Sequence, residues 1–499
     1  MRIRTPLLFA PVVLAGAFLL AAPAAPAAAQ AGGVIEARSS AVVSQSPLTA
    51  GGQAFDIQGL AGDSTWPAMI GAILGPDVQR LEDLTGLQMP GGTIVVAEVG
   101  NGGLNDHALG YDPATRTVGI PESATPRMVA HALSHIWFNS TLFEDTWVSE
   151  GLAGYSEIAA GAGNYVPCTA TPAYPGSGTP SLSKWLTLNL NSTIQDQNVS
   201  DWQYAASCAF FTSVADAMGP DAFKSVLRAA VGGERAYAAV STADPQIGAP
   251  GPLTSQQLVD LIDEDGMIAA GVTDPGRTQQ FLAGDGVFSA AVLSARLDAR
   301  TAYRAQVAQS GKWTLPVAVR IPMSGWDFTA AKTSMAQTAA ILNLRASIQK
   351  SLPGFSMDGT QVETQFEAAA TRTDLDSLNS LMSRMSNASA RIATATGLKS
   401  GGHDPLQTIG LVGSDLDTPL NQARADLEKM DPDDAGLKAQ SVIDGVNGSA
   451  LLGLLRLVVA GALIAFVLLL IALLIRFVIL PLRRRRAAAS AGASPESPT

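Results

Sequence analysis

The chain has 499 residues, of which 47% are hydrophobic and only 15% are charged, which excludes a mostly disordered protein. The formal net charge of −11 argues against a nucleic-acid-binding protein. Only 2 cysteines are present, which excludes a disulfide-stapled scaffold and a cysteine-rich zinc domain.

The first thirty residues have the pattern of a secretory signal peptide. Arg2 and Arg4 precede an apolar run from Leu7 to Leu20, and a stretch of small residues follows. This order of basic, apolar and small residues predicts cleavage near Ala29 or Ala31. The alternative is an N-terminal membrane anchor that is not cleaved.

Beyond the signal peptide, the sequence predicts a small α+β region. Residues 31–60 are small and polar and are expected to form a flexible N-terminal segment. Apolar residues at helical spacing predict a helix over 66–87, and the β-branched stretch 93–99 predicts a strand. Residues 108–122 contain turn residues between two short strands, which indicates a hairpin.

The next segment, 123–139, carries two of the four histidines. Thr125 is a suitable N-cap and Pro126 suits the first helical turn, so a helix is predicted. His131 and His135 are four residues apart and therefore share one helix face, where both imidazoles can reach one metal ion. The alternative is a pair of histidines packed in the core.

A second helix start, TWVSEGLAGYSE, places Glu150 fifteen residues after His135. If this helix is antiparallel to the first, Glu150 can reach the same point as the histidines. Two imidazoles and one carboxylate leave a fourth position open for water, which is typical of catalytic zinc sites. Zinc is therefore the expected cofactor.

These two segments resemble the gluzincin metallopeptidases, the group that includes aminopeptidase N and thermolysin. The family helix reads H-E-x-x-H, and the second reads W-x-x-E-G-x-A-x-Y, which Trp147, Glu150, Gly151, Ala153 and Tyr155 match. The resemblance covers roughly residues 90–231. It implies His131, His135 and Glu150 as zinc ligands, and it implies Tyr204 as the tyrosine that stabilises the transition state.

Three departures from the family pattern bear on activity. Ala132 occupies the position of the general-base glutamate, whose loss typically reduces the rate by ~10² to 10⁴. The loop from His135 to Glu150 is shorter than in aminopeptidases, and no G-x-M-E-N segment is present upstream. We therefore expect impaired catalysis and no exopeptidase role.

The other candidate residues have simpler explanations beside the functional ones. Tyr204 fits a core aromatic as well as a catalytic group, and Glu157 fits an exposed carboxylate as well as a partner of a metal ligand. His107 is expected at the surface and His403 in a loop. Cys168 and Cys208 are expected to form one disulfide between a Gly/Pro-rich loop and a helix over 202–218.

The remainder of the chain is predicted to be helical up to its basic end. Helices are expected at 221–231, 254–264, 285–309, 327–351, 360–396, 418–430 and 434–447. A heptad-like stripe over 375–392 is too short for a coiled coil and favours a bundle.

The apolar stretch Leu457–Ile475 is long enough to cross a bilayer, and Arg483–Arg486 after it mark the cytoplasmic side. The predicted fold is α+β, with a small mixed sheet on a two-helix zinc-binding gluzincin domain, then a helical bundle or stalk and one transmembrane helix. The predicted parts are a signal peptide (1–30), a flexible segment (31–60), the gluzincin-like domain (61–253), the bundle (254–448), the transmembrane helix (449–482) and a basic cytoplasmic tail (483–499).

Three functions follow from these features. The first is a single-pass cell-membrane protein whose outward-facing, zinc-binding domain binds peptides or protein partners, with the strand before the zinc helix pairing with an extended peptide. The second is an active metallopeptidase that uses another base. The third is a structural envelope protein that binds no metal.

Overall fold

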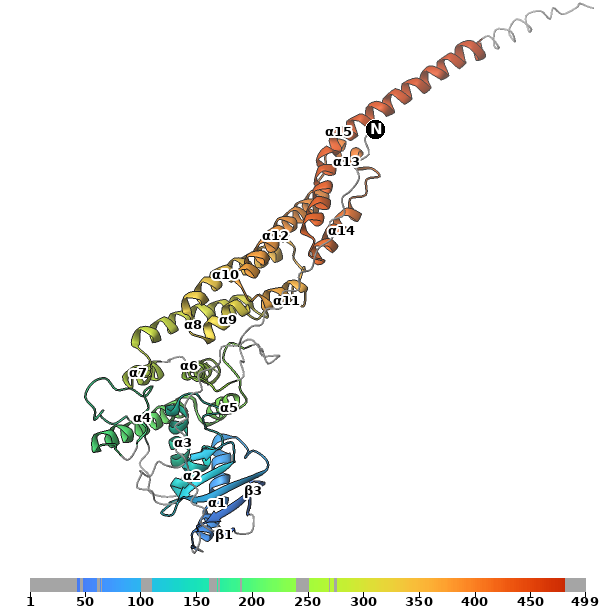
Figure 1. The fold of residues 1–499 in the computed structure, drawn as a ribbon. Helices are drawn as coiled ribbons and strands as arrows, with labels where there is room; N and C mark the ends of the chain where they lie inside the picture. The colour runs from blue at the N-terminus through green and yellow to red at the C-terminus, as the bar shows by residue number, and fades with distance from the viewer. Residues whose placement is uncertain are drawn as a thin grey trace, which may run out of the picture.

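The structure is a computed structural model. It describes residues 43–44, 48–60, 63, 65–99, 110–160, 168, 171–188, 191–238, 251–268, 270–272 and 276–480. The predicted signal peptide, the predicted cytoplasmic tail and His107 lie outside these residues. The described chain is mostly helical, with a small mixed sheet at one end, a helical stalk, and one long apolar helix at the other end (Figure 1).

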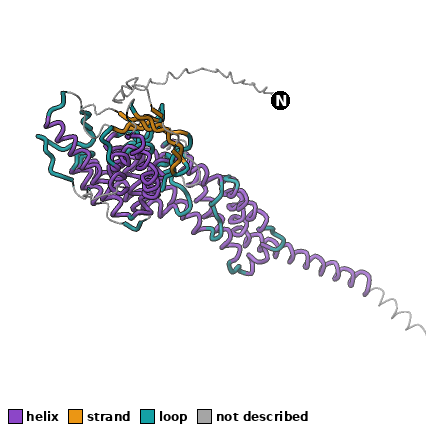
Figure 2. The backbone as a smooth tube through the Cα atoms, turned by 90° about the horizontal axis from the view of Figure 1, so that it is seen from below, coloured by secondary structure: helices purple, strands orange, loops and turns teal. Residues whose placement is uncertain are grey.

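A six-stranded mixed sheet forms the N-terminal end of the molecule. Its strands are β1 Val43–Ser44, β2 Leu48–Ala50, β3 Gln53–Gly59, β4 Thr93–Val99, β5 Gly110–Asp112 and β6 Thr117–Pro121. Their order is β1-β3-β4-β6-β5, with β2 also paired to β3. The pairs β3–β4 and β4–β6 are parallel, and the β5–β6 hairpin is antiparallel. The strands gather on one side of the helices (Figure 2).

Two expectations about this sheet are wrong. The segment 31–60 is not flexible throughout, because β3 lies inside the sheet. Phe55 and Ile57 are fully or almost fully buried, and they alternate with Asp56 and Gln58 as a half-buried strand requires. The strand before the zinc helix, β6, is not an edge strand, because β4 and β5 pair with its two sides. On this side of the described sheet the edge strand is β5.

The helices that pack on the sheet form the first half of the core with it. Helix α1, Thr65–Thr85, connects β3 to β4, and its buried stripe includes Trp66, Ile70 and Leu74. The helices that follow are α2 Pro126–Ser134, α3 Thr146–Ala160, α4 Ile194–Met218, α5 Pro220–Val231 and α6 Ser255–Leu261, and α6 continues as a π-helical segment, Ile262–Met267. Helix α2 contacts α1, α3 and β6, which places it between the sheet and the other helices.

The second half is the stalk. Its helices are α7 Gly276–Gly284, α8 Ala290–Ser310, α9 Val317–Ser324, α10 Phe328–Ser351, α11 Gln361–Ala368, α12 Arg372–Ser400, α13 Pro405–Leu411, α14 Asp417–Glu428 and α15 Pro432–Leu474. Helices α10 and α12 pack together, and α12 in turn packs on α15. The predicted stripe on α12 is buried in this bundle, with Leu375, Met382 and Ile392 at 0% exposure.

Several helix boundaries differ from the predicted ones. The segment 285–309 begins later, because Ser289 caps α8 by accepting a hydrogen bond from the Val292 amide at 3.3 Å. The segment 360–396 is two helices, since Thr371 and Asp374 form a capping box that starts α12. Helices α7, α9 and α13 were not predicted.

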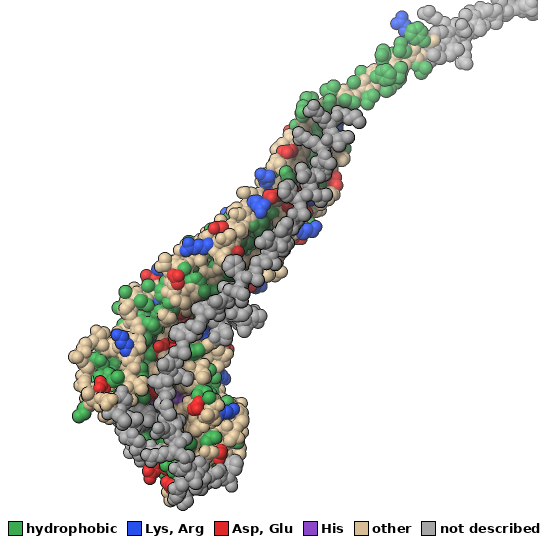
Figure 3. Space-filling model, in the orientation of Figure 1, with side chains coloured by type: hydrophobic (Ala, Val, Ile, Leu, Met, Phe, Trp, Pro, Cys, Tyr) green, Lys and Arg blue, Asp and Glu red, His purple; other side chains and the backbone are tan. Residues whose placement is uncertain are grey.

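The helix predicted at 434–447 and the apolar span are one continuous helix. Among the described residues, Pro432–Phe477 is the one helix long and apolar enough to cross a membrane. Its apolar side chains are exposed where it leaves the bundle, as the space-filling view shows (Figure 3).

Candidate metal centre

Helix α2 begins as the sequence predicts and ends earlier. The Thr125 hydroxyl accepts from the Met128 amide at 3.3 Å, and Pro126 is in the first turn. The helix ends at Ser134, with His135 as its C-cap in the right-handed region (φ −65, ψ −10). His135 therefore still lies one turn after His131, and the two rings are 5.0 Å apart.

Helix α3 brings Glu150 to the same point because it packs closely on α4. A Cβ atom at Gly151 would lie 2.9 Å from the side chains of Phe211 and Ser207, so a larger residue would push the two helices apart. This close approach gives a physical reason for the glycine that follows Glu150. The neighbouring Trp147 stacks on Phe211.

The three predicted ligand atoms form a compact triangle. His131 Nε2 lies 3.2 Å from His135 Nε2 and 3.3 Å from Glu150 Oε2, and the third side, His135 Nε2 to Glu150 Oε2, is 3.5 Å. A tetrahedral zinc ion with bonds of about 2.0–2.1 Å requires ligands about 3.3–3.4 Å apart. The three residues therefore fit zinc in both chemistry and spacing.

The other ring nitrogens of both histidines face acceptors. His131 Nδ1 lies 2.8 Å from Glu157 Oε2, and His135 Nδ1 lies 2.9 Å from the Phe138 carbonyl oxygen. Because a carboxylate and a carbonyl only accept, each Nδ1 donates and each neutral imidazole keeps its lone pair on Nε2. Three electron-pair donors therefore meet at one buried point. Among the described residues none donates a well-formed hydrogen bond to Glu150 Oε2.

The electrostatics of the cluster favour the ionised carboxylate. Burial would raise the pKa of Glu150, but His135 and His131 lower it to about 2. Burial lowers the pKa of His135, and Glu150 more than offsets this effect, so the pKa is raised. An anionic ligand between two imidazoles suits a divalent cation.

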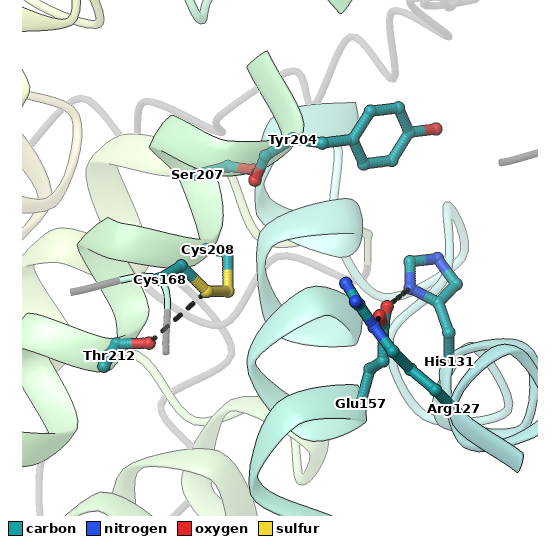
Figure 4. The surroundings of a disulfide bond; sticks show 8 residues. All are labelled: Arg127, His131, Glu157, Cys168, Tyr204, Ser207, Cys208 and Thr212. Atoms are coloured by element: carbon teal, nitrogen blue, oxygen red, sulfur yellow. Dashed lines mark hydrogen bonds and ion pairs between the residues drawn. A yellow bond between two sulfur atoms is a disulfide. The ribbon is translucent and has the colours of Figure 1, made fainter. Parts of the chain in front are cut away.

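Glu157 is not an exposed carboxylate. Its side chain is 12% exposed, and it lies between His131, whose Nδ1 donates to it, and Arg127, with which it forms an ion pair (Figure 4). The seven-residue spacing from Glu150 placed Glu157 on the correct helix face. The sequence did not indicate that Arg127 contacts Glu157 or that the Phe138 carbonyl accepts from His135, because neither residue is part of a motif with a known spacing.

Tyr204 lies close to the ligands and also packs against an aromatic ring. Burial raises the pKa of Tyr204, and a hydrogen bond to Glu150 raises it further, so the hydroxyl stays protonated as a donor. The ring makes an edge contact with Trp185, with centroids 5.0 Å apart. Tyr204 is therefore both a neighbour of the metal-ligand cluster and an aromatic residue packed against another ring, so both of its predicted roles fit its position.

Ala132 is fully buried next to His131. Three described polar residues near it in the sequence are engaged elsewhere or exposed. The Ser134 hydroxyl donates to the His131 carbonyl at 2.6 Å. The Asp145 carboxylate accepts from the amide and hydroxyl of Ser255, at the start of α6. Glu144 is exposed.

Cys168 and Cys208 form a disulfide, with their Cα atoms 5.9 Å apart (Figure 4). The bond attaches the irregular segment before α4 to that helix, one turn after Tyr204. Gln203 also holds this segment, since its amide donates to the carbonyls of Ser181 and Lys184 and accepts from the Leu186 amide. His403 lies in the predicted loop, with Nε2 3.3 Å from the Lys399 carbonyl oxygen.

No protein-family model and no curated protein matches the chain. Among solved structures, it overlaps an M1 zinc metallopeptidase from Deinococcus radiodurans with 18% identity and a TM-score of 0.33, covering 49% of this chain and 51% of that one. A mutant of that peptidase bound to a Tyr-Ser-Ala substrate gives 19% identity and a TM-score of 0.31 over the same shares. The chain thus spans about half the length of these peptidases, and TM-scores this low do not define a shared fold.

Proposed function

We propose that the protein is a membrane-anchored zinc-binding protein of the metallopeptidase type, with its site outside the cell and with impaired catalysis. The observation that carries this proposal is the triangle of three buried electron-pair donors with sides of 3.2, 3.3 and 3.5 Å. With both imidazoles neutral, the two lone pairs and the carboxylate repel one another, so without a metal ion the cluster must take up a proton, in agreement with the raised pKa of His135.

Zinc held by His131, His135 and Glu150 would polarise a carbonyl group and lower the pKa of a bound water toward ~7. The chain itself supplies Tyr204 as a hydrogen-bond donor and Glu157 as the acceptor that orients His131. It supplies no carboxylate at Ala132 to take the proton from that water. The role that remains is to bind a peptide or protein segment, with the β5 edge available for pairing.

Metal content tests the proposal. Full-length protein in detergent is analysed for zinc by mass spectrometry, beside a His131→Ala/His135→Ala variant and a His403→Ala control. We expect near one zinc per chain in the native protein and in the control, and none in the double variant. No zinc in any of them after incubation with excess metal would leave the structural, metal-free function.

A second candidate function, slow peptide hydrolysis, is favoured by the contact between Tyr204 and Glu150. Native protein loaded with zinc and incubated with a peptide library distinguishes the two. Cleavage that is absent in the double histidine variant would establish hydrolysis. Peptides that stay intact with the native protein would leave peptide binding as the function.

A further inference from the structure

Above the apolar span, α15 carries large apolar side chains that nothing in the described structure covers. Leu451, Leu452, Leu454 and Leu455 are 73%, 47%, 50% and 58% exposed, and all four precede Arg456, the charged residue before the uncharged stretch Leu457–Ile475. Helix α13 and the residue after it add Leu406 and Val412, 36% and 66% exposed. We call these six residues the apolar collar.

Helix α13 is fixed tightly beside α15 at this level. A Cβ atom at Gly410 would lie 1.8 Å from the Ser449 carbonyl oxygen, and one at Gly453 would lie 1.9 Å from that of Leu406. The two backbones are therefore in direct contact, at the end of the bundle from which the apolar helix emerges (Figure 1). The collar is a rigid feature of the fold.

Arg456 is already partnered by this helix. Its Nη1 atom donates to the carbonyl oxygens of Ile409, at 2.7 Å, and Val412, at 2.8 Å. These carbonyls lie at the C-terminal end of α13, where a helix leaves acceptors unsatisfied and carries partial negative charge. An arginine at the edge of a bilayer usually extends toward lipid phosphates. Here one nitrogen of Arg456 donates to the protein, and the side chain stays exposed, so its other N–H groups can reach the headgroup layer.

The lengths agree with a deeper position. The 19 residues from Leu457 to Ile475 rise about 28 Å, close to the ~30 Å hydrocarbon thickness. Leu455 lies about 3 Å higher and Leu451 about 9 Å higher, whereas one headgroup layer is ~5–7.5 Å deep when the whole bilayer is ~40–45 Å thick, so the collar extends from the hydrocarbon boundary to the outer edge of that layer. The collar would thus lie in the lipid headgroup layer, where both the apolar and the polar groups of α13 can be solvated.

We propose that the apolar collar, including α13, is immersed in the lipid headgroup and glycerol layer on the stalk side of the membrane. Lipid is the occupant that the structure favours, because the collar is continuous with the exposed apolar face of the membrane-crossing candidate helix. The stalk therefore enters the membrane surface through two helices and not through α15 alone. This arrangement restricts how far the stalk can tilt.

Depth measurements on single-cysteine variants test the proposal. The described residues contain no free cysteine, so a thiol-reactive NBD dye should label an introduced cysteine selectively. Val412→Cys is compared with Leu437→Cys, which is 67% exposed on α15 about 21 Å above Leu451, and with Leu463→Cys, 59% exposed inside the span. All three sites are exposed, so the substitutions should not impair folding. Each full-length protein is placed in phosphatidylcholine/phosphatidylglycerol vesicles.

We expect headgroup-nitroxide lipid to quench the Val412 label several-fold more than the Leu437 label, and acyl-chain nitroxide to quench the Leu463 label most. Equal quenching at Val412 and Leu437 would overturn the proposal. So would a Val412 label that is shielded from water-soluble quencher but not quenched by lipid, since a protein would then cover the collar. An unquenched Leu463 label would show that the helix does not span the membrane at all.

Discussion

At the scale of single residues, position 132 is where the proposed loss of peptide hydrolysis can be tested. Ala132→Glu would place a carboxylate beside His131, and we expect hydrolysis of a peptide library to rise by ~10² to 10⁴ over the native protein. Ala132→Gln is the matched control, because it has the same size and no base. Both variants need a melting curve, since Ala132 is fully buried. A folded, zinc-loaded Ala132→Glu protein without activity would contradict a peptidase-like site.

In the proposed zinc site, Glu157 would act on the metal through His131. Glu157→Gln keeps the shape but removes the negative charge that accepts the Nδ1 proton at 2.8 Å. Such partners of metal ligands typically contribute a factor of ~10–100 to affinity, so we expect zinc to bind ~10–100-fold more weakly in a competition titration. Glu144→Gln, at an exposed carboxylate, should leave the affinity unchanged. Equal affinities for both variants would mean that Glu157 does not orient His131.

We expect Asp77 to make the free energy of unfolding depend on pH, independently of the candidate metal centre. Burial raises the pKa of Asp77 to about 6 from 3.8, and no described residue hydrogen-bonds its Oδ2 atom. The folded state therefore prefers the protonated form, and this stabilisation is complete below pH 3.8 and is lost as the pH rises through 6. Asp77→Asn should raise the melting temperature at pH 7 and change it little below pH 4. The exposed Asp83→Asn should show no such difference between the two pH values.

At the scale of elements, the sequence predicted the strands and helix ends that depend on a few neighbouring residues. The strand 93–99, the hairpin and the start of α2 at Thr125 are confirmed, because β-branched runs, turn residues and caps act over a few residues. Strand β3 was not predicted from the sequence. Its short stretch of alternating apolar and polar residues does not indicate which strand it pairs with, and its partner in the structure is β4. The ligand spacing indicated the triangle, whereas the distances within it depend on the packing of Gly151 against α4.

A buried ion-pair network joins the site-bearing end to the stalk. Arg296 of α8 contacts Asp260 at 2.5 Å and Asp263 at 2.7 Å, and all three side chains are at most 1% exposed. Arg296→Met would leave two buried carboxylates with less compensation, and we expect a loss of ~3–5 kcal/mol in unfolding free energy. Arg304→Met, at a side chain 43% exposed, should lose less than ~1 kcal/mol. Denaturant titration measures both, and equal losses would refute a role of the network in stability.

At the scale of the whole molecule, this network connects the candidate metal centre to α8 of the stalk, and we expect the two to open as one cooperative unit. The Trp147 indole of α3 donates to the Ser255 hydroxyl of α6 at 2.9 Å, and α6 leads directly to Asp260 and its partner Arg296. Zinc at 100 times its dissociation constant stabilises the folded state by about 2.7 kcal/mol, or ~100-fold in opening equilibria. The effect should therefore extend beyond the ligands themselves.

We expect chelation of zinc from the full-length protein to speed hydrogen exchange by up to ~100-fold in α2, α3, α6 and α8 together. Exchange in α12 and α14 should not change, because these helices contact the stalk only. In an Arg296→Met/Arg300→Met variant the response should stop at α6, because the buried ion pairs of α8 with Asp260, Asp263 and Glu264 are then lost. A response confined to α2 and α3 in the native protein would show that the two ends of the molecule open independently.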